Sequence, residues 1–386
     1  MHRNDGAPRD GAGPSIVVIG GYGAVGGATA TALGTWFPGR VVAAGRDPAK
    51  AADLAASTGG AVRAARVDAG DPAQVERLLD DAAVVVMCVE RANAAVARAC
   101  LGRGVHYVDI TASTPLIRAI TALDPLARRT GATAVLSVGV APGLTNLLAR
   151  HCAERLPSAE TVDVSLLLGM GGDHGPDSVR WIVEQLTAPD RPRGPAGRRA
   201  RVRLGEREVR TVHPFPFSDQ YEISEALGVP ATTRICFDSA LVTSALFGLR
   251  TVRFFDLARR LRAEPLLVSA LTRVHLGSDR FVVHVAASDA GGGDAGRGDA
   301  ERGDAGRGTV SSTVTGRDTC RATAVVTAQV ARLLLTEPAP PGVVHIDRLL
   351  PAGPFLDELE RHRMTVTHHD HHDHHAVRRP CRDSAG

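Results

Sequence analysis

Short apolar runs alternate with helix-like segments along the first 150 residues of the chain. Residues 15–20, 40–45 and 83–88 are almost wholly apolar, and a segment with helical character follows each of them. A strand that is apolar on both faces is typical of a parallel sheet, because helices cover both of its faces. The pattern therefore predicts an α/β fold with a doubly wound parallel sheet over residues 15–150.

The pattern changes in the second part of the chain. Residues 151–335 mix candidate strands and helices without regular alternation, which predicts a second, α+β domain. Within it, residues 289–308 carry a Gly-Asp-Ala-Gly-Arg repeat without apolar side chains, so we expect a disordered loop between two strands. Residues 336–366 predict a short strand and a terminal helix. We expect the two polar ends, residues 1–14 and 367–386, to be disordered.

The turn between the first predicted strand and its helix is rich in glycine. Gly21, Gly23 and Gly26 form a G-x-G-x-x-G motif. The first glycine permits a tight turn, the second lets the backbone approach a pyrophosphate, and the third lets helix and strand pack closely. The helix N-terminus then offers free N–H groups to the phosphates. We predict a dinucleotide-binding turn, the alternative being an ordinary glycine-rich turn. Its expected cofactor contacts are Gly20, Gly21, Tyr22, Gly23, Ala24, Val25 and Gly26.

The end of the second predicted strand indicates which dinucleotide is bound. NAD-specific enzymes usually place an acidic residue there, to hold the ribose 2′-OH. This chain has Arg46 instead, and a guanidinium suits a 2′-phosphate. Asp47, which precedes Pro48, has the features of a helix N-cap. We therefore predict NADP(H) rather than NAD(H), the alternative being that Arg46 is a solvated surface charge.

Ligands of doubly wound sheets bind outside the carboxyl ends of the strands. That rule selects the segments after the fourth and fifth predicted strands and the Gly/Pro loop at residues 138–143. The alternative for each is a plain connecting loop, and we interpret the Cys88 thiol as a packing group rather than a nucleophile. The further cofactor contacts that we expect are Asp68, at the end of the third predicted strand, and Cys88, Val89, Gly139, Pro142 and Gly143 in these segments.

Composition argues against several other classes of function. A net charge of +3 over 386 residues gives no reason to expect nucleic-acid or membrane binding. No apolar run approaches the ~18 residues of a membrane span, and the first residues lack a signal peptide's apolar region, so we expect a cytoplasmic protein. Six scattered cysteines without a C-x-x-C motif argue against a zinc site and a disulfide framework. The His/Asp-rich residues 368–375 could bind Ni²⁺, Cu²⁺ or Zn²⁺, but we expect adventitious binding and predict no metal site.

Four stretches of the sequence resemble the saccharopine dehydrogenase-type NADP-binding oxidoreductases: residues 18–26, 87–90, 104–111 and 138–146. The resemblance implies a Rossmann domain, to which the C-terminal segment returns. It also implies a second domain that carries substrate contacts and often a homodimer interface. The implied reaction is hydride transfer between NADP(H) and a C–N bond, typically an imine made from an amino acid and a carbonyl compound. The substrate-binding residues of the lysine-pathway enzymes have no recognisable counterparts in the second domain, and the glycine-rich repeat and the His-rich tail are not features of the family. We therefore expect an amino-acid-like substrate, with a role in specialised biosynthesis at least as much favoured as saccharopine itself.

Reduction of an imine requires the protein to orient the substrate and to supply a proton at nitrogen. Three residues are candidates for this acid–base role. Asp109 ends a predicted strand, where the alternative is a loop or helix cap. His174 lies in a glycine-rich loop, where the alternative is a surface histidine. Tyr221 follows an aromatic stretch, where the alternative is packing.

Two other functions remain open on the same residues. One is carbonyl or enoyl reduction with the same cofactor. The other is a dinucleotide-binding sensor or partner protein without catalysis. A metal-handling protein that acts through the His-rich tail is a further, less favoured interpretation.

Overall fold

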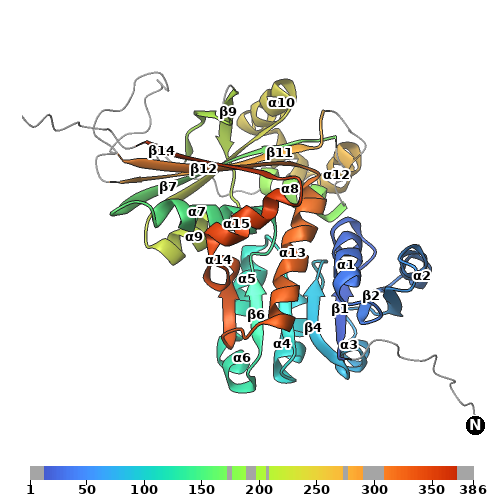
Figure 1. Cartoon of the computed structure of the whole chain (residues 1–386). Coiled ribbons are helices and arrows are strands. Elements are labelled where there is room, and N and C mark those ends of the chain that lie inside the picture. The colour runs from blue at the N-terminus through green and yellow to red at the C-terminus, as the bar shows by residue number, and fades with distance from the viewer. Residues whose placement is uncertain are drawn as a thin grey trace, which may run out of the picture.

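The chain folds around two seven-stranded sheets with helices between and around them (Figure 1). The first sheet lies in the lower half of Figure 1 and the second in the upper half. This arrangement confirms the predicted α/β fold with a second sheet-containing domain. The computed structural model describes residues 13–171, 176–187, 197–205, 208–272, 277–289 and 308–371.

The first sheet is parallel throughout, with the strand order β13-β6-β5-β4-β1-β2-β3. The chain runs outward from β1 to β3 and then continues on the other side of β1 with β4, so the order reverses there. Such a reversal is where doubly wound sheets bind their ligands, at the carboxyl ends of the strands. The strands are β1 (Ser15–Ile19), β2 (Val41–Gly45), β3 (Val62–Arg66), β4 (Ala82–Met87), β5 (His106–Asp109), β6 (Thr133–Leu136) and β13 (Gly342–His345).

Apolar side chains on both faces of this sheet explain its two helical layers. Along β1, Ile16 and Val18 enter one hydrophobic core, whereas Val17 and Ile19 enter another on the opposite face. The helices that follow the first five strands and complete the layers are α1 (Ala24–Trp36), α2 (Pro48–Ser57), α3 (Pro72–Leu79), α4 (Asn93–Gly102), α5 (Thr114–Thr121) and α6 (Asp124–Thr130).

The second sheet is mixed, with the order β14-β12-β11-β7-β10-β9-β8. Strands β7 and β10 are parallel, and the other neighbours are antiparallel. The strands are β7 (Ala159–Leu168), β8 (Ala200–Arg203), β9 (Val209–Pro214), β10 (Ala231–Phe237), β11 (Arg280–Asp289), β12 (Thr309–Arg317) and β14 (Thr365–His371). The helices of this half are α7 (Thr145–Ala153), α8 (Pro176–Thr187), α9 (Asp219–Leu227), α10 (Ala240–Thr251), α11 (Phe254–Arg260) and α12 (Glu264–Thr272).

The last part of the chain visits both sheets. Helix α13 (Thr319–Thr336) packs beside α1 and against β4 and β5, and β13 then becomes the edge strand of the first sheet. Helices α14 (Ile346–Leu349) and α15 (Ala352–Glu360) pack against α7, and β14 ends in the second sheet. The return to the first domain that the resemblance implied is therefore present, and it already starts at α13.

Two boundaries differ from those drawn on the sequence. Helix α13, assigned to the second domain, packs on the first sheet because small buried residues on α13 and α1 let the two helices lie side by side. Residues 367–371, assigned to a disordered tail, form the end of β14, which pairs with β12 from Thr365 to His371. Strands β11 and β12 are an antiparallel pair as expected, while the repeat at residues 290–307 lies outside the described residues, as do residues 1–12 and 372–386.

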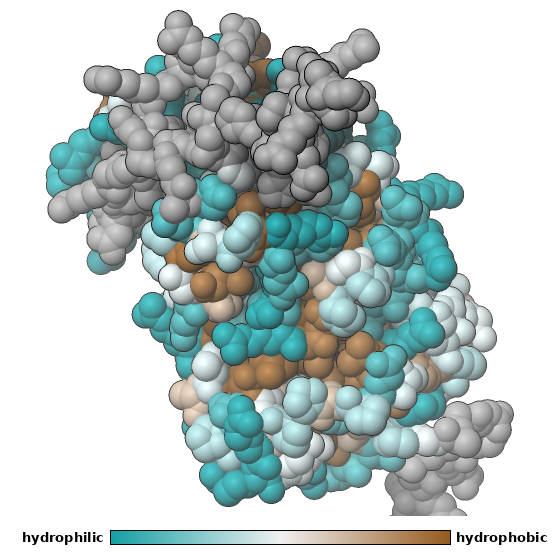
Figure 2. All heavy atoms as spheres, turned by 60° about the vertical axis from the view of Figure 1, so that its left-hand side comes forward, coloured by the Kyte–Doolittle hydropathy of each residue, from teal (hydrophilic) through white to brown (hydrophobic). Residues whose placement is uncertain are grey.

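The surface of the described residues mixes hydrophilic and hydrophobic side chains. In Figure 2, which brings the left-hand side of Figure 1 forward, hydrophobic residues gather in the middle of the lower half and hydrophilic ones surround them. Within the described chain, no helix combines the length and the apolar character needed to cross a membrane.

Candidate active site

The glycine turn connects the carboxyl end of β1 with α1, as predicted. A Cβ atom on Gly21 would stand 2.6 Å from the carbonyl oxygen of Val18, and one on Gly26 would overlap the carbonyl oxygen of Gly20. Both positions therefore require glycine, because the turn lies directly on the strands. Gly23 is the N-cap of α1, and no side chain caps the helix. The N–H groups of the first turn thus remain available to an anion, which fits the pyrophosphate of a dinucleotide.

The end of β2 is shaped by Tyr22. Its ring lies so close to Gly45 that a Cβ atom there would overlap the ring, and its hydroxyl accepts a hydrogen bond from the backbone N–H of Asp47 at 2.9 Å. The carboxylate of Asp47 accepts from the backbone N–H groups of Ala49 and Lys50, which confirms the predicted N-cap. The backbone of Arg46 is therefore held just before this cap, while its side chain is exposed. This position fits the predicted contact with a 2′-phosphate.

The loops after β3 and β4 are joined by an ion pair between Asp68 and Arg91. Arg91 donates to both carboxylate oxygens, at 2.8 and 3.2 Å. These hydrogen bonds lower the pKa of Asp68, and a further hydrogen bond from the N–H of Gly70 acts in the same direction. Arg91 thus holds the Asp68 carboxylate in place at the edge of the sheet where Arg46 lies.

Asp109 is fully buried at the end of β5. Its carboxylate accepts from the Tyr107 hydroxyl at 2.6 Å, from Nδ2 of Asn93 at 3.0 Å and from the N–H of Thr111 at 2.8 Å. Burial raises its pKa to about 6 although these hydrogen bonds act in the opposite direction. The hydrogen bond from Thr111 is the contact expected of the loop-cap alternative, and the other two donors also belong to the first domain.

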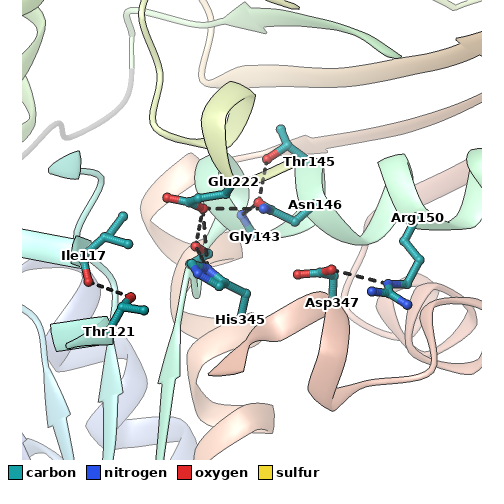
Figure 3. A network of polar contacts seen from close by, with 10 residues as sticks. Ile117, Thr121, Gly143, Thr145, Asn146, Arg150, Glu222, His345 and Asp347 are labelled. Atoms are coloured by element: carbon teal, nitrogen blue, oxygen red, sulfur yellow. Dashed lines mark hydrogen bonds and ion pairs between the residues drawn. The ribbon is translucent and has the colours of Figure 1, made fainter. Parts of the chain in front are cut away.

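A second polar cluster brings together three segments far apart in the chain (Figure 3). Ser137 directly follows β6, His345 is the last residue of β13, and Glu222 comes from α9 in the second domain. The Ser137 hydroxyl donates a short hydrogen bond to Oε2 of Glu222, and its oxygen lies 2.8 Å from Nδ1 of His345. Nδ1 of His345 also lies 3.6 Å from the same carboxylate oxygen. We call Ser137, Glu222 and His345 the interdomain triad.

The loop after β6 also contacts this triad. Oδ1 of Asn146 accepts from the N–H of Gly143 at 2.9 Å, and its Nδ2 points to Oε2 of Glu222 at 3.5 Å. Gly143 adopts φ +137°, and Gly139 and Pro142 are buried with it against α7, α9 and α13. Gly139, Pro142 and Gly143, which we expected to contact the cofactor, therefore lie in the loop that positions Asn146 beside Glu222.

Burial shifts the pKa values of Glu222 and His345 in opposite directions. It raises the pKa of Glu222, and the negative charge of Asp347 adds to this effect. It lowers the pKa of His345, so its imidazole is uncharged at neutral pH. Asp347 itself pairs with Nε of Arg150 at 3.3 Å. Burial also raises the pKa of Asp219, which precedes Glu222 by three residues on α9, to about 6.

The second oxygen of Glu222 points away from the triad in Figure 3. Within the described chain this atom, Oε1, is buried and has no well-aligned hydrogen-bond donor; the Ser218 hydroxyl is a further polar group beside the carboxyl. A buried carboxyl oxygen without a donor is costly unless it carries a proton or meets a ligand's donor. Glu222 is therefore suited to exchange a proton with a bound molecule.

Helix α8 brings the second domain to the end of β4. Burial raises the pKa of Glu184 on this helix, and the negative charge of Glu90, just after β4, contributes to the shift. Glu90 is itself held by the Thr111 hydroxyl at 2.6 Å. The second domain thus approaches the carboxyl edge of the first sheet both at β4 and at β6 and β13.

The remaining predicted site residues lie apart from the triad. Tyr221 neighbours Glu222 on α9, but 51% of its surface is exposed. Burial raises the pKa of the Cys88 thiol, which therefore stays protonated, and Val89 packs against Gly20. His174 lies outside the described residues.

Sequence reasoning missed Ser137, Asn146, Glu222 and His345. The rule that ligands bind at strand ends pointed to the segment that follows Ser137. No comparable signal marked Glu222 or His345, which reach the site from other parts of the chain.

Comparison with known proteins agrees with a dinucleotide-binding first domain. Residues 16–135 match the family model of the saccharopine dehydrogenase NADP binding domain. A solved apo saccharopine dehydrogenase (L-Glu forming) from Saccharomyces cerevisiae is 14% identical, with a TM-score of 0.56 over 92% of this chain and 100% of that one. GenD2 from gentamicin A biosynthesis, in complex with NAD, is 16% identical, with a TM-score of 0.35 over 74% of this chain and 72% of that one. The match over residues 16–135 and the shared fold confirm the resemblance found in the sequence: the first domain of this chain is similar to the NADP binding domain of saccharopine dehydrogenases.

Proposed function

We propose that this protein is an NADP(H)-dependent oxidoreductase that reduces a C=N bond of an amino-acid-derived substrate, or oxidises the corresponding amine. The observation that carries the proposal is the interdomain triad. It places a buried carboxyl of raised pKa at the carboxyl edge of the dinucleotide-binding sheet, with an oxygen left for a ligand's donor. A bond between carbon and nitrogen needs such a group, because nitrogen gains or loses a proton as carbon gains or loses a hydride.

The cofactor, when bound, supplies or accepts the hydride at carbon. The backbone of the glycine turn and the first turn of α1 would hold its pyrophosphate, and Arg46 its 2′-phosphate. The second domain then has to place the substrate nitrogen near Glu222. In the direction of reduction, the Glu222 carboxyl gives its proton to nitrogen; in the direction of oxidation, its carboxylate takes the proton back.

Ser137 and His345 can restore the proton of Glu222. With Nδ1 of His345 as the donor, a proton passes to the Ser137 oxygen while the Ser137 hydroxyl proton passes to Oε2 of Glu222. Nε2 of His345 takes up a proton from solvent in the same step, so the imidazole stays uncharged. Asn146 holds the carboxyl from its other side and keeps Oε2 directed at Ser137. In this proposal Glu222 is the proton donor, and Ser137 and His345 return a proton to it after each reaction.

Cofactor choice is tested by titrating the protein with NADPH and NADH and reading nicotinamide fluorescence. We expect tighter binding of NADPH, and in Arg46→Ala a loss of about 10- to 100-fold in NADPH affinity with little change for NADH. Arg63→Ala, at an exposed position in β3, is the matched control and should keep the preference. Equal affinity of the wild type for both dinucleotides would overturn the assignment of Arg46.

Catalysis is tested by screening amines with 2-oxo acids and aldehydes while following NADPH absorbance. Glu222→Gln should lower kcat by about 10²- to 10⁴-fold, as expected for loss of a general acid, and leave NADPH affinity unchanged. Glu337→Gln, an exposed acid just after α13 and outside the triad, should retain wild-type kcat. Tight NADPH binding without turnover of any pair would favour the sensor interpretation, and turnover of carbonyl or enoyl compounds without an amine would favour that class of reductase.

A further inference from the structure

A pocket opens at the edge of the first sheet, between the end of β3 and helix α3. Its volume is about 440 Å³, and it is lined by Arg66, Gln74, Arg77 and Leu78. Arg66 is the last residue of β3, whereas the other three follow helical spacing on one face of α3. We call this hollow the β3–α3 pocket. Two of its four lining side chains are cationic and none is anionic, so the pocket suits an anion.

Within the described part of the chain, the two arginines of this pocket form no ion pair. The acidic residues of α3 and its two caps are Asp71, Glu76 and Asp80. Gln74 donates to Asp71 at 2.7 Å, and Arg103 pairs with the other two carboxylates at 3.2 and 3.1 Å. The charge of Arg77 contributes to the lowered pKa of Asp71, behind the larger effect of the hydrogen bonds from Gln74, but no ion pair joins the two. The positive charge of the pocket is therefore left for an external anion.

Arg66 lies directly beside the predicted site of the 2′-phosphate. In the register of the sheet it is opposite Gly45, the residue before Arg46, and the N–H of Val67 donates to the carbonyl oxygen of Gly45 at 2.9 Å. Neighbouring strands lie about 4.8 Å apart. The backbones that carry Arg46 and Arg66 are therefore adjacent, and both side chains start at the carboxyl edge of the sheet.

The Arg46 side chain lies within electrostatic range of the end of β3. Its positive charge lowers the pKa of Asp68, just after this strand, although the hydrogen bonds from Arg91 have a larger effect. The N–H of Asp68 donates to Oε1 of Gln74 at 3.0 Å, and Gln74 is one wall of the pocket. Asp68 thus connects Arg46 to the β3–α3 pocket, and its own charge is balanced by Arg91 at 2.8 Å.

The 2′-phosphate of NADP(H) needs more positive charge than one arginine supplies. A phosphate monoester carries a charge of about −1.5 to −2 at neutral pH and offers three terminal oxygens. One guanidinium binds two of these oxygens, which leaves a third oxygen and part of the charge unmatched. A second arginine at the adjacent strand end meets this requirement.

We propose that Arg66 binds the 2′-phosphate of NADP(H) together with Arg46, and that the β3–α3 pocket is the part of the cofactor site that selects NADP(H) over NAD(H). Arg66 is the direct contact, whereas Arg77 adds positive charge from the α3 wall of the pocket. Gln74 is a fixed wall rather than a ligand contact, because both ends of its amide are already bonded. The inference rests on the proposed function in one respect, which is that the bound dinucleotide is NADP(H).

The experiment is a titration of the full chain with NADPH and NADH, read by nicotinamide fluorescence, for the wild type and for Arg46→Ala, Arg66→Ala and Arg77→Ala. We expect Arg66→Ala to weaken NADPH binding about 10-fold and to leave NADH binding unchanged, since NADH has no 2′-phosphate. Arg77→Ala should weaken NADPH binding about two- to fivefold, because it acts as a more distant surface charge. Arg63→Ala, whose Cα partner is Val42 rather than the strand end, is the matched control and should keep the wild-type preference.

Two nucleotides without nicotinamide isolate the 2′-phosphate. Adenosine 2′,5′-bisphosphate and 5′-AMP differ only in this group, and both are used to displace NADPH. The bisphosphate should displace NADPH from the wild type at the lower concentration, and Arg66→Ala should remove about 10-fold of this advantage. Melting temperature, measured in parallel, shows that each variant is folded.

Three results would overturn the inference. If Arg46→Ala loses the preference for NADPH while Arg66→Ala keeps it, the cofactor assignment stands and Arg66 has no part in the phosphate site. Equal losses of NADPH and NADH affinity in a folded Arg66→Ala protein would show that Arg66 contacts a part shared by both dinucleotides. A wild type that binds both dinucleotides equally overturns the choice of NADP(H) itself, and the inference with it.

Discussion

At the scale of single residues, Tyr221 and Glu222 show how far a sequence can locate a site. The two are neighbours on α9, but 51% of Tyr221 is exposed, whereas only 9% of the Glu222 side chain is. Successive residues of a helix point about 100° apart, so the side that faces the first sheet depends on how α9 packs. Glu222 meets partners 85 residues away at Ser137 and over a hundred residues away at His345. Contacts of that separation leave no local pattern, and the sequence therefore led to the neighbouring tyrosine.

Asp219, at the start of the same helix, provides a test by pH. Burial raises its pKa to about 6 in the folded protein, whereas an unfolded aspartate titrates near pH 4. Between these values the folded state keeps a proton that the unfolded state has lost, so the free energy of unfolding falls as pH rises through this window. Asp219→Asn removes this loss. Relative to the wild type, the variant should therefore gain up to about 3 kcal/mol in free energy of unfolding between pH 4 and pH 7.

Urea unfolding at a series of pH values measures this difference directly. The amide oxygen that the substitution introduces can still accept from the Thr233 hydroxyl, which donates to the Asp219 carboxyl at 2.7 Å in the wild type. Asp53→Asn, at an exposed position of α2, controls for the loss of a charge. A difference between Asp219→Asn and the wild type that stays constant across this pH range would contradict the burial argument.

At the scale of elements, the β1–α1–β2 unit was predictable because its constraints are local. Gly21 and Gly26 are required by atoms of the turn itself or of the adjoining strands, such as Val18, Gly20 and Ala43. The spacing of the glycines alone therefore predicts the geometry of the turn. The interdomain triad depends on elements from three distant parts of the chain, and its assembly requires the whole fold.

Two adjacent glycines of α1 give a matched test of this unit. A Cβ atom on Gly26 would overlap the carbonyl oxygen of Gly20, whereas one on Gly27 would have its nearest neighbour at 3.7 Å. Gly26→Ala should push α1 off the strand, lower the melting temperature and abolish NADPH binding. Gly27→Ala should be tolerated and add about 0.5–1 kcal/mol of stability, because alanine favours helix. Thermal unfolding and NADPH titration distinguish these outcomes; equal behaviour of the two variants would mean that close packing at Gly26 is not required.

At the scale of the whole molecule, the sequence predicted two domains and a returning segment but not how closely they are interwoven. The sequence indicated a helix at 322–335 and a short strand at 343–346, yet it could not say which sheet each joins. Packing and strand pairing decide which sheet each joins: α13 packs against the small residues of α1, and β13 pairs with the open edge of β6. The sequence did not predict β14, because this segment is rich in histidine and has the composition of a solvated tail.

Removal of β14 tests its contribution to the second sheet. This strand covers the edge of β12, and Nδ1 of His368 lies 2.8 Å from the Ser312 hydroxyl. A chain that ends at Met364 should melt at least about 5 °C below one that ends at His371, and aggregate more readily, because the edge of β12 is then unpaired. Scanning calorimetry and light scattering of the two truncated chains measure this. Equal melting temperatures would show that β14 adds little to the stability of the sheet.

The interwoven path also sets the order of events during synthesis on the ribosome. Each sheet receives its outermost strand late, the first when residues 342–345 emerge and the second when residues 365–371 emerge. Multidomain proteins usually fold their N-terminal domain while the rest is still being made. Here a nascent chain has two unfinished sheets at once, each with an open edge. The same path means that genetic recombination cannot exchange the second half for another without also removing β13 from the first sheet, so the two halves are inherited as one unit.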